Sequence, residues 1–154
     1  CSTTPGPTGG GIYSDLMDAT HFANCAGTIT VEDCVFTGQL DDGINIHGAY
    51  FPVLRRLDAH TLLAARRHPQ QAGAPVGGSG DRFALANADA LIDYWSGTCD
   101  EMEDLNPFVA RLRFHEPLPS GLRTGDALDN LSWHPTAFVR RNHFLRNRAR
   151  GALL

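Results

Sequence analysis

Three aspartates in the first third of the chain have the chemistry of an acid–base pair. Asp18 opens the segment Asp18–Phe22, and Asp41 and Asp42 stand directly before Gly43. Cleavage of a glycosidic bond requires one carboxylic acid that donates a proton and one carboxylate that activates water. An Asp-Asp-Gly sequence is equally typical of a simple turn. The catalytic interpretation therefore depends on whether the fold brings Asp18 beside the later pair.

A weak internal repeat predicts that it does. Residues 18–22 align with residues 42–46 at an offset of 24, and residues 29–36 align with residues 137–144 at an offset of 108. Short runs of β-forming residues alternate with Gly, Asp and Asn, without the period of a helix. Repeats of about 22–25 residues made of strands and tight turns are typical of a parallel β-helix, whose coils share one core.

Equivalent positions in such coils lie above one another, about 4.8 Å apart. This register places Asp18, Asp42 and Arg150 in one column, with Asp41 alongside. Like-charged carboxylates at this spacing raise the pKa of at least one of them. Arg150 is then expected to act as a counter-ion or as a clamp on the substrate.

A long segment, residues 49–128, interrupts the repeat. It contains four strand-like runs separated by turn residues, and the acidic stretch from residue 88 to 94 fits either a short helix or a further strand. Several short strands with turns between them predict a small inserted β-barrel. We therefore expect an all-β protein with parallel β-helix coils at 1–48, an inserted β-barrel-like domain at 49–128 and a return to the β-helix at 129–154, in a chain cut from a longer protein. The four runs are Tyr50–Leu57, Thr61–Arg66, Arg82–Ala86 and Phe108–His115.

Other polar residues near the aspartates are candidates for substrate binding. His47 and Asn45 follow the Asp pair and suit hydrogen bonds to sugar hydroxyls, although a turn His and an inward-facing Asn ladder remain open for them. Arg148 and Arg150 flank one residue, so strand alternation would send both to one face. Trp95 is expected to pack in a core rather than to stack on a sugar, and Trp133 likewise.

Composition excludes several other classes. The 154 residues are 42% hydrophobic with a net charge of -4, which fits a globular unit with no global positive field for nucleic acid. No apolar run reaches the roughly 18 residues of a membrane span. Seven His residues show no metal-like spacing. Of the four Cys residues, Cys25 and Cys34 lie in alternating apolar stretches, where we expect small buried thiols.

Three segments together resemble glycoside hydrolase family 110. They are Asp-Ala-Thr-His-Phe at 18–22, Asp-Asp-Gly-Ile-Asn-Ile-His-Gly-Ala-Tyr at 41–50 and Asn-Arg-Ala-Arg-Gly-Ala-Leu-Leu at 147–154. That family comprises inverting exo-α-galactosidases that act on terminal α-1,3-linked galactose, on a right-handed parallel β-helix with β-barrel insertions. The resemblance is sparse across the insertion, where it is carried by a His-x-Gln-x-x-Gly segment starting at His68 and by residues 125–130.

By position, the resemblance implies that Asp18, Asp41 and Asp42 are the catalytic carboxylates. Asp18 and Asp42 are too close to be the acid and base of an inverting enzyme, which stand about 6.5–9.5 Å apart, so we expect them to share the water. The proton donor is then Asp41, or one of two acids from the insertion. Those two are Asp81 and Asp129.

The remaining expectations concern binding, cofactors and location. The candidate substrate-binding residues are His47, Asn45, His68, Gln70, Arg148 and Arg150. Hydrolysis is expected to need no metal and no organic cofactor, and the partner is a glycan with a terminal α-galactoside, not nucleic acid or a membrane. The resemblance implies secretion or a periplasmic location. Two alternatives stay open: another β-helix carbohydrase of the polygalacturonase type, and a non-catalytic glycan-binding β-helix.

Overall fold

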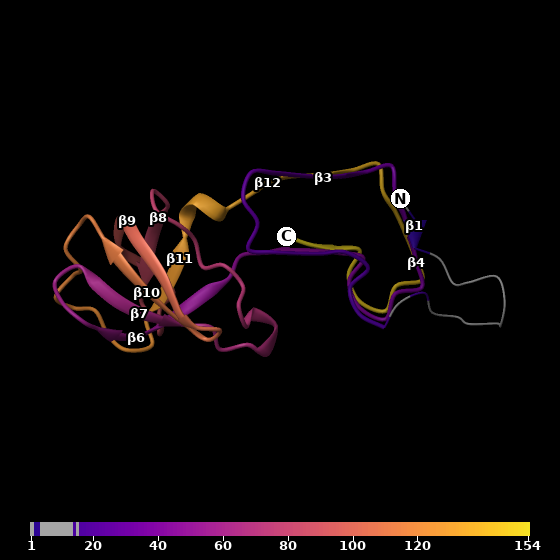
Figure 1. The fold of residues 1–154 in the computed structure, drawn as a ribbon. Helices are drawn as coiled ribbons and strands as arrows, with labels where there is room; N and C mark the ends of the chain where they lie inside the picture. The colour runs from indigo at the N-terminus through magenta and orange to yellow at the C-terminus, as the bar shows by residue number, and fades with distance from the viewer. Residues whose placement is uncertain (1, 4–13, 15) are drawn as a thin grey trace. The chain divides into compact units, whose positions relative to one another are not determined.

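A computed structural model shows two compact units, each with its own hydrophobic core (Figure 1). Unit 1 comprises the described parts of residues 1–48 together with residues 134–154, and unit 2 comprises residues 49–133. The residues that the structure describes are 2–3, 14 and 16–154.

The regular structure in this described part of the chain is all β, as predicted, apart from two short 3-10 turns. These are η1 (Pro69–Gln71) and η2 (Leu131–Trp133). No helix among the same residues is long and apolar enough to cross a bilayer.

Unit 2 is a closed barrel of six antiparallel strands in the order β10-β7-β6-β11-β8-β9. Closure pairs every strand on both sides and so leaves no open sheet edge. The predicted β-barrel is therefore confirmed. Its strands are β6 (Tyr50–Arg56), β7 (Thr61–Ala65), β8 (Arg82–Ala86), β9 (Asp93–Asn106), β10 (Val109–Phe114) and β11 (Ala127–Asn130).

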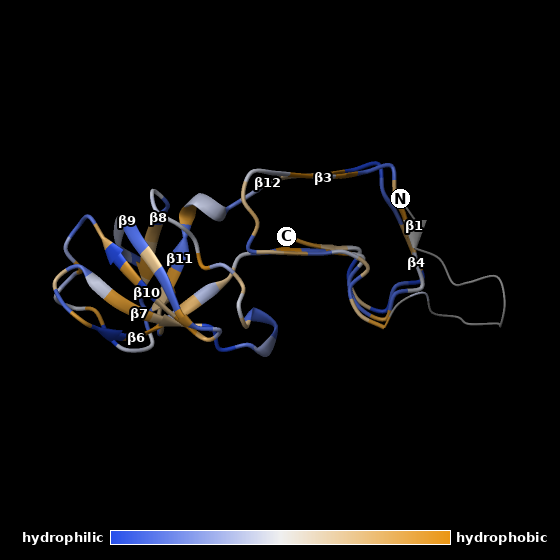
Figure 2. Cartoon of the chain, viewed as in Figure 1, coloured by the Kyte–Doolittle hydropathy of each residue, from blue (hydrophilic) through white to orange (hydrophobic). Residues whose placement is uncertain are grey.

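The barrel interior follows from the two-residue period of its strands. In β10, Ala110, Leu112 and Phe114 are buried, whereas the Arg residues between them are exposed. Figure 2 shows the same alternation of apolar and polar residues along the barrel strands. The ring of Phe114 packs edge-on against Phe83 at 5.7 Å and against Trp95 at 5.2 Å between ring centroids. The prediction that Trp95 packs in a core is thus confirmed.

The acidic stretch after β8 forms a turn and then a strand, so the short helix considered for residues 88–94 is wrong. The Asn87 side chain accepts hydrogen bonds from the backbone N–H groups of Asp89 (2.9 Å) and Ala90 (3.1 Å). These are the bonds of a helix N-cap, but the single turn stops at Leu91, whose φ of 53° lies in the left-handed region. From Asp93 onward, the chain pairs with β8 and then with β10 as β9, 14 residues long.

Unit 1 is built from three small sheets in which every strand pair is parallel. The first and third sheets take one strand from each of three passes of the chain, and the second sheet takes one strand from each of two passes. The first sheet is β1 (Ser2–Thr3), β4 (Val35–Thr37) and β13 (His143–Leu145), the second is β3 (Thr28–Glu32) and β12 (Thr136–Arg140), and the third is β2 (His21–Ala23), β5 (Ile44–His47) and β14 (Ala152–Leu153).

The pairing register is the one that the internal repeat predicts. His21 pairs with Asn45, at an offset of 24. Ile29 pairs with Ala137, at an offset of 108, and Ile44 with Ala152 at the same offset. The offsets read from the sequence are therefore confirmed residue by residue within the described strands.

In the interior of unit 1, equivalent residues of different passes stack on one another. The rings of Phe36 and Phe144 lie 5.1 Å apart and nearly parallel, at 8°. Gly43 lies under this stack, where an added Cβ would stand 2.7 Å from the Gly151 carbonyl oxygen and 2.7 Å from the Phe144 ring. Only glycine allows this approach of the two passes.

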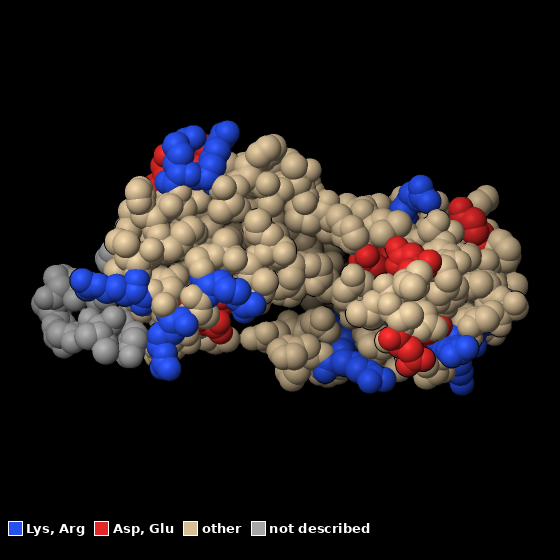
Figure 3. Space-filling view, turned by 180° about the vertical axis from the view of Figure 1, so that it is seen from behind, with Lys and Arg blue, Asp and Glu red and all other residues tan. Residues whose placement is uncertain are grey.

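The turns repeat between passes as well. Asp33 and Arg141, 108 residues apart, both have φ of 54°, in the left-handed region. Arg141 donates two hydrogen bonds of 2.7 Å to the Asp33 carboxylate, and Arg140 pairs with Glu32 beside them. Figure 3 likewise shows basic and acidic side chains next to one another at several places on the face in view.

The cysteines correct one prediction. Cys34 is disulfide-bonded, so the thiol expected there is wrong; its partner lies outside the described residues, as does Cys1. Cys25 is a free thiol, but it is only half-buried. Burial in the barrel raises the pKa of the free Cys99 thiol to about 11, and the nearby Asp81 and Asp100 charges add to the effect.

Candidate active site

The structure brings the three predicted aspartates together in unit 1. Asp18 lies just before β2, and Asp41 and Asp42 lie just before β5, its parallel neighbour. The strand register continues into these turns, because the Ala19 N–H donates to the Asp42 carbonyl at 3.0 Å. One carboxylate oxygen from each Asp lies within 4.8 Å of the other two. We call Asp18, Asp41 and Asp42 the carboxylate cluster.

Asp42 is the buried member of the cluster, with 1% of its side chain exposed. Its Oδ1 accepts hydrogen bonds from the Arg150 backbone N–H at 2.9 Å and from Arg150 Nε at 3.0 Å. Burial by itself would raise the pKa of Asp42, but these hydrogen bonds and the Arg150 charge outweigh it and lower the pKa below its usual value. Asp42 is therefore held as a carboxylate, and for this residue the expected upward shift is reversed by the predicted counter-ion.

Asp18 and Asp41 share one donor. The Asp42 backbone N–H points between Asp18 Oδ1 at 3.2 Å and Asp41 Oδ1 at 3.1 Å. Asp18 Oδ2 also accepts from Asn45 Nδ2 at 2.9 Å. Asp18 is largely enclosed, with 11% of its side chain exposed, whereas Asp41 is exposed to solvent. The cluster thus contains one buried, one partly covered and one open carboxylate.

Asn45 faces the cluster because of strand alternation. Its neighbours Ile44 and Ile46 point into the core of unit 1, with 0% and 7% exposed, so Asn45 points outward. Its hydrogen bond to Asp18 makes the outward position the correct one of the two considered.

A histidine pair adjoins Asp18. His21 Nδ1 lies 3.5 Å from Asp18 Oδ2, and His21 Nε2 lies 2.6 Å from His47 Nε2. His47 Nδ1 is 2.7 Å from the Gly48 carbonyl oxygen. The sequence offset pairs His21 with Asn45, so His47 is a diagonal neighbour within reach of it. His21 is not among the site residues predicted from the sequence, and this diagonal is the signal that identifies it.

Arg148 does not join Arg150 at the cluster. Residues 147–150 form a turn rather than a strand, so alternation does not place both side chains on one face. The backbone N–H of Arg148 donates to the Gln39 carbonyl at 3.0 Å, and its side chain is exposed.

The candidates from the insertion have structural partners within unit 2. His68 Nδ1 accepts from the Gln70 backbone N–H at 3.3 Å and so caps η1. Asp81 Oδ2 accepts from the Gly78 backbone N–H at 2.9 Å and from Asn130 Nδ2 at 3.1 Å. Asp129 is buried in β11, with 6% exposed.

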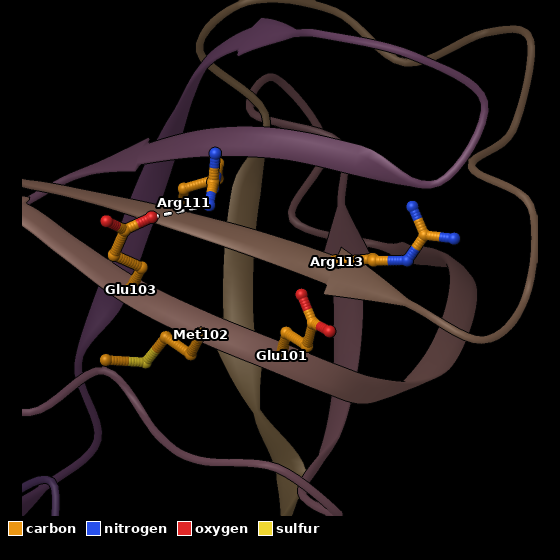
Figure 4. A pocket seen from close by; sticks show the side chains of 5 residues that line it. All are labelled: Glu101, Met102, Glu103, Arg111 and Arg113. Atoms are coloured by element: carbon orange, nitrogen blue, oxygen red, sulfur yellow. Dashed lines mark ion pairs between the residues drawn. The ribbon is translucent and has the colours of Figure 1, made fainter.

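A hollow on the barrel surface offers no comparable chemistry. It is lined by residues of β9 and β10, which Figure 4 shows along the two strands. Glu103 forms an ion pair with Arg111 there, and both side chains are about half exposed. Exposed pairs of this kind contribute little energy and are strongly screened. The lining residues are Glu101, Met102, Glu103, Arg111 and Arg113.

Several oxygens of the carboxylate cluster already accept hydrogen bonds from protein donors. Arg150 bonds to Asp42, and both Asp18 oxygens accept hydrogen bonds. With three carboxylates and one guanidinium, the formal charge is -3 + 1 = -2 when all are ionised. This arrangement suits the handling of protons and of an electron-poor sugar carbon.

Comparison with known proteins links both units to one kind of enzyme. The family model described as GLAA-B beta-barrel domain II matches residues 61–128. The chain is 35% identical over 144 residues to alpha-1,3-galactosidase B of Akkermansia muciniphila, covering 94% of this chain and 18% of that protein. It is 36% identical over 146 residues to alpha-1,3-galactosidase A of Shewanella woodyi, covering 94% of this chain and 24% of that protein.

These matches confirm the resemblance to α-1,3-galactosidases that the Asp-rich segments indicated. The insertion, where the sequence motifs were sparse, is the segment that the barrel family model matches. The chain spans only 18% and 24% of the lengths of these two curated relatives.

Proposed function

We propose that the protein containing this chain is a glycoside hydrolase that removes terminal α-1,3-linked galactose from glycans with inversion. The observation that carries the proposal is the carboxylate cluster, in which Asp18 meets Asp41 and Asp42 across parallel neighbouring strands. The similarity to proteins named alpha-1,3-galactosidase supports the substrate class.

The proposed scaffold is a right-handed parallel β-helix at 1–48 and 134–154, with the barrel inserted at 49–133. The barrel runs past the expected boundary at residue 128 because β11 pairs with β6 and β8. The three parallel sheets and the in-register offsets support stacked coils in unit 1. In this scaffold the cluster occupies equivalent positions of consecutive coils, so that the sequence repeat itself creates the site.

In the proposed reaction, Asp18 and Asp42 hold the attacking water. Asp18 is the more accessible of the two and takes a proton from the water as its oxygen bonds to the anomeric carbon. Asp42 stays ionised through Arg150 and stabilises the positive charge that develops on the sugar. The bond from the anomeric carbon to the leaving oxygen breaks on the opposite face.

Asp41 is the proposed proton donor to the leaving oxygen. Its exposure lets the side chain swing outward, toward the roughly 6.5–9.5 Å that an inverting pair requires. The hydrogen bonds that Asp81 forms with Gly78 and Asn130 make it the weaker candidate, and the burial of Asp129 does the same. Proton transfer from Asp41 yields a free hydroxyl on the shortened glycan.

Substrate hydroxyls are proposed to bind to the polar rim of the cluster. Arg150 keeps 61% of its side chain exposed while it bonds to Asp42, so its remaining guanidinium N–H groups can donate to a sugar. His47 and Asn45 belong to the same proposed rim, whereas Arg148, whose turn does not place its side chain beside Arg150, is not part of it. His68 and Gln70 are proposed contacts from the insertion.

The full-length protein tests this proposal directly. We expect it to release galactose from α-1,3-galactosyl oligosaccharides and from p-nitrophenyl α-galactoside, and NMR to detect β-galactose as the first product. The Asp18→Asn and Asp42→Asn variants are expected to lose about 10²–10⁴-fold in turnover. Hydrolysis of polygalacturonate instead of galactosides would overturn the proposal. So would binding of glycans that releases no galactose and that is unaffected by these variants.

A further inference from the structure

We propose that His21 and His47 form a pair that positions Asp18. The two rings together carry three N–H protons, one more than two neutral imidazoles. The catalytic consequence of the pair rests on the proposed glycosidase function, in which Asp18 takes a proton from water. The pair itself rests on three contacts in line: Asp18 to His21, His21 to His47, and His47 to the Gly48 carbonyl.

Counting protons along this line gives the inference. A carbonyl oxygen only accepts, so the proton between Gly48 and His47 belongs to His47 Nδ1. The 2.6 Å contact between the two Nε2 atoms needs one proton as well. The third contact sets His21 Nδ1 against Asp18 Oδ2 at 3.5 Å, where two lone pairs would repel without a proton between them.

Three contacts thus need three protons, and two neutral imidazoles supply two. The third makes one ring an imidazolium facing the Asp18 carboxylate. With it, Asp18 has two hydrogen-bond donors, the Asp42 N–H and Asn45 Nδ2, and a third, longer donor contact from His21 Nδ1 at 3.5 Å. Together they fix the orientation of the carboxylate.

The charges around the pair favour this extra proton. Among the described residues, Asp18 contacts His21 directly; Asp41 and Asp42 gather around Asp18, and Arg150 is paired with Asp42. Cys25 follows on the same pass as a free thiol. The His21 ring keeps 40% of its side chain exposed, so protons exchange with solvent.

The expected consequence is an alkaline limit to activity. Imidazole titrates near neutral pH, and its extra proton is present at low pH and lost as pH rises. Once it is lost, His21 presents a lone pair to Asp18, which then loses its third donor. The fall in turnover at alkaline pH is therefore expected to track the loss of the extra proton from the histidine pair.

The first experiment is a pH profile of kcat for the full-length protein. His21→Gln, which donates a hydrogen bond but does not titrate, is expected to lower kcat about 10- to 100-fold and to flatten the alkaline fall. His47→Asn is expected to move the alkaline fall in the same way. His143→Asn, on an exposed strand position of unit 1, is the matched control and leaves the profile unchanged.

The second experiment needs no activity. Nitrogen-15 NMR of ring-labelled histidines in the full-length protein, assigned through the His21 and His47 variants, is expected to show one doubly protonated ring and Nδ1–H on His47 at neutral pH. If both rings are neutral, or if both variants keep the alkaline fall in kcat of the unsubstituted protein, the proposed pair is overturned. A protonated pair in a protein that cleaves no galactoside would instead refute the proposed function and leave the pair standing.

Discussion

Asp42 and Arg150, 108 residues apart in the chain, are joined by two hydrogen bonds to a single carboxylate oxygen, one from the backbone and one from the guanidinium. The backbone bond depends on the parallel stacking of two passes, and the side-chain bond depends on Arg150 itself. Because Asp42 is buried, this contact decides whether it is charged.

Replacing Arg150 with Ala is expected to destabilise the protein by about 1–3 kcal/mol, because a buried carboxylate loses a charged donor. In the native protein the lowered pKa of Asp42 gives stability that is present above the unfolded pKa and lost as pH falls through the folded pKa. Without the Arg150 guanidinium, burial is opposed by the backbone N–H of residue 150 alone, so the pKa rises and less stability is left to be lost on acidification. The destabilisation of the variant is therefore largest near neutral pH and shrinks as pH falls. Urea unfolding at several pH values measures both effects. Arg148→Ala is the control, and an equal shift in that variant would contradict the assignment.

The sequence predicted much of unit 1, because its repeat is a direct statement about register. An offset of 24 sets Asp18 beside Asp42, and an offset of 108 sets Ile44 beside Ala152. Parallel stacking carries such offsets into three dimensions without any further assumption. Gly and Asp at the turns marked where the strands end.

The sequence predicted less where local chemistry overrode the pattern. The turn that Asn87 caps stops at Leu91, whose φ is 53°, although the sequence there also fitted a helix. The turn before β14 removed the alternation assumed for Arg148. The role of His21 depends on a diagonal contact with His47, which no single-strand pattern contains. The disulfide of Cys34 had no spacing signal at all.

Asp41→Asn is expected to distinguish the proton donor from the base, because the loss of activity should depend on the leaving group of the substrate. Natural α-1,3-galactosyl glycans need a protonated leaving oxygen, so their hydrolysis is expected to fall about 10²–10⁴-fold. p-Nitrophenolate leaves without protonation, so p-nitrophenyl α-galactoside is expected to lose far less. Steady-state kinetics with both substrates measures the difference, and Asp18→Asn, which removes the base, is expected to impair both alike. If Asp81→Asn gave the selective pattern and Asp41→Asn did not, the donor would belong to the insertion.

Tyr94→Phe tests the polar contact that anchors the start of β9. The Tyr94 hydroxyl donates to Asp126 Oδ2 at 2.6 Å, and Asp126 is 2% exposed. Burial raises the pKa of Asp126, but the bonds from Tyr94 and from the Arg123 and Ala88 backbone N–H groups outweigh it and lower the pKa overall. Loss of the hydroxyl is expected to cost about 1–2 kcal/mol and to start acid unfolding at a higher pH. Denaturation of the variant at pH values from about 3 to 7, the range over which carboxylates titrate, checks this. A shift of acid unfolding to lower pH would contradict it.

Gly43→Ala tests the close approach of two passes in unit 1. The new methyl group would stand 2.7 Å from the Gly151 carbonyl oxygen and from the Phe144 ring, and neither the backbone nor the stacked ring has room to retreat. Overpacking of this kind costs about 1–3 kcal/mol, so we expect a lower midpoint of urea unfolding. Gly48→Ala is the matched control, because nothing lies within 4 Å of its added Cβ. Since Gly43 immediately follows Asp42, displacement of the two passes is also expected to lengthen the bonds from Arg150 and to lower turnover. Equal stability of the two variants would show that the passes are not packed as tightly as the Gly43 contacts require.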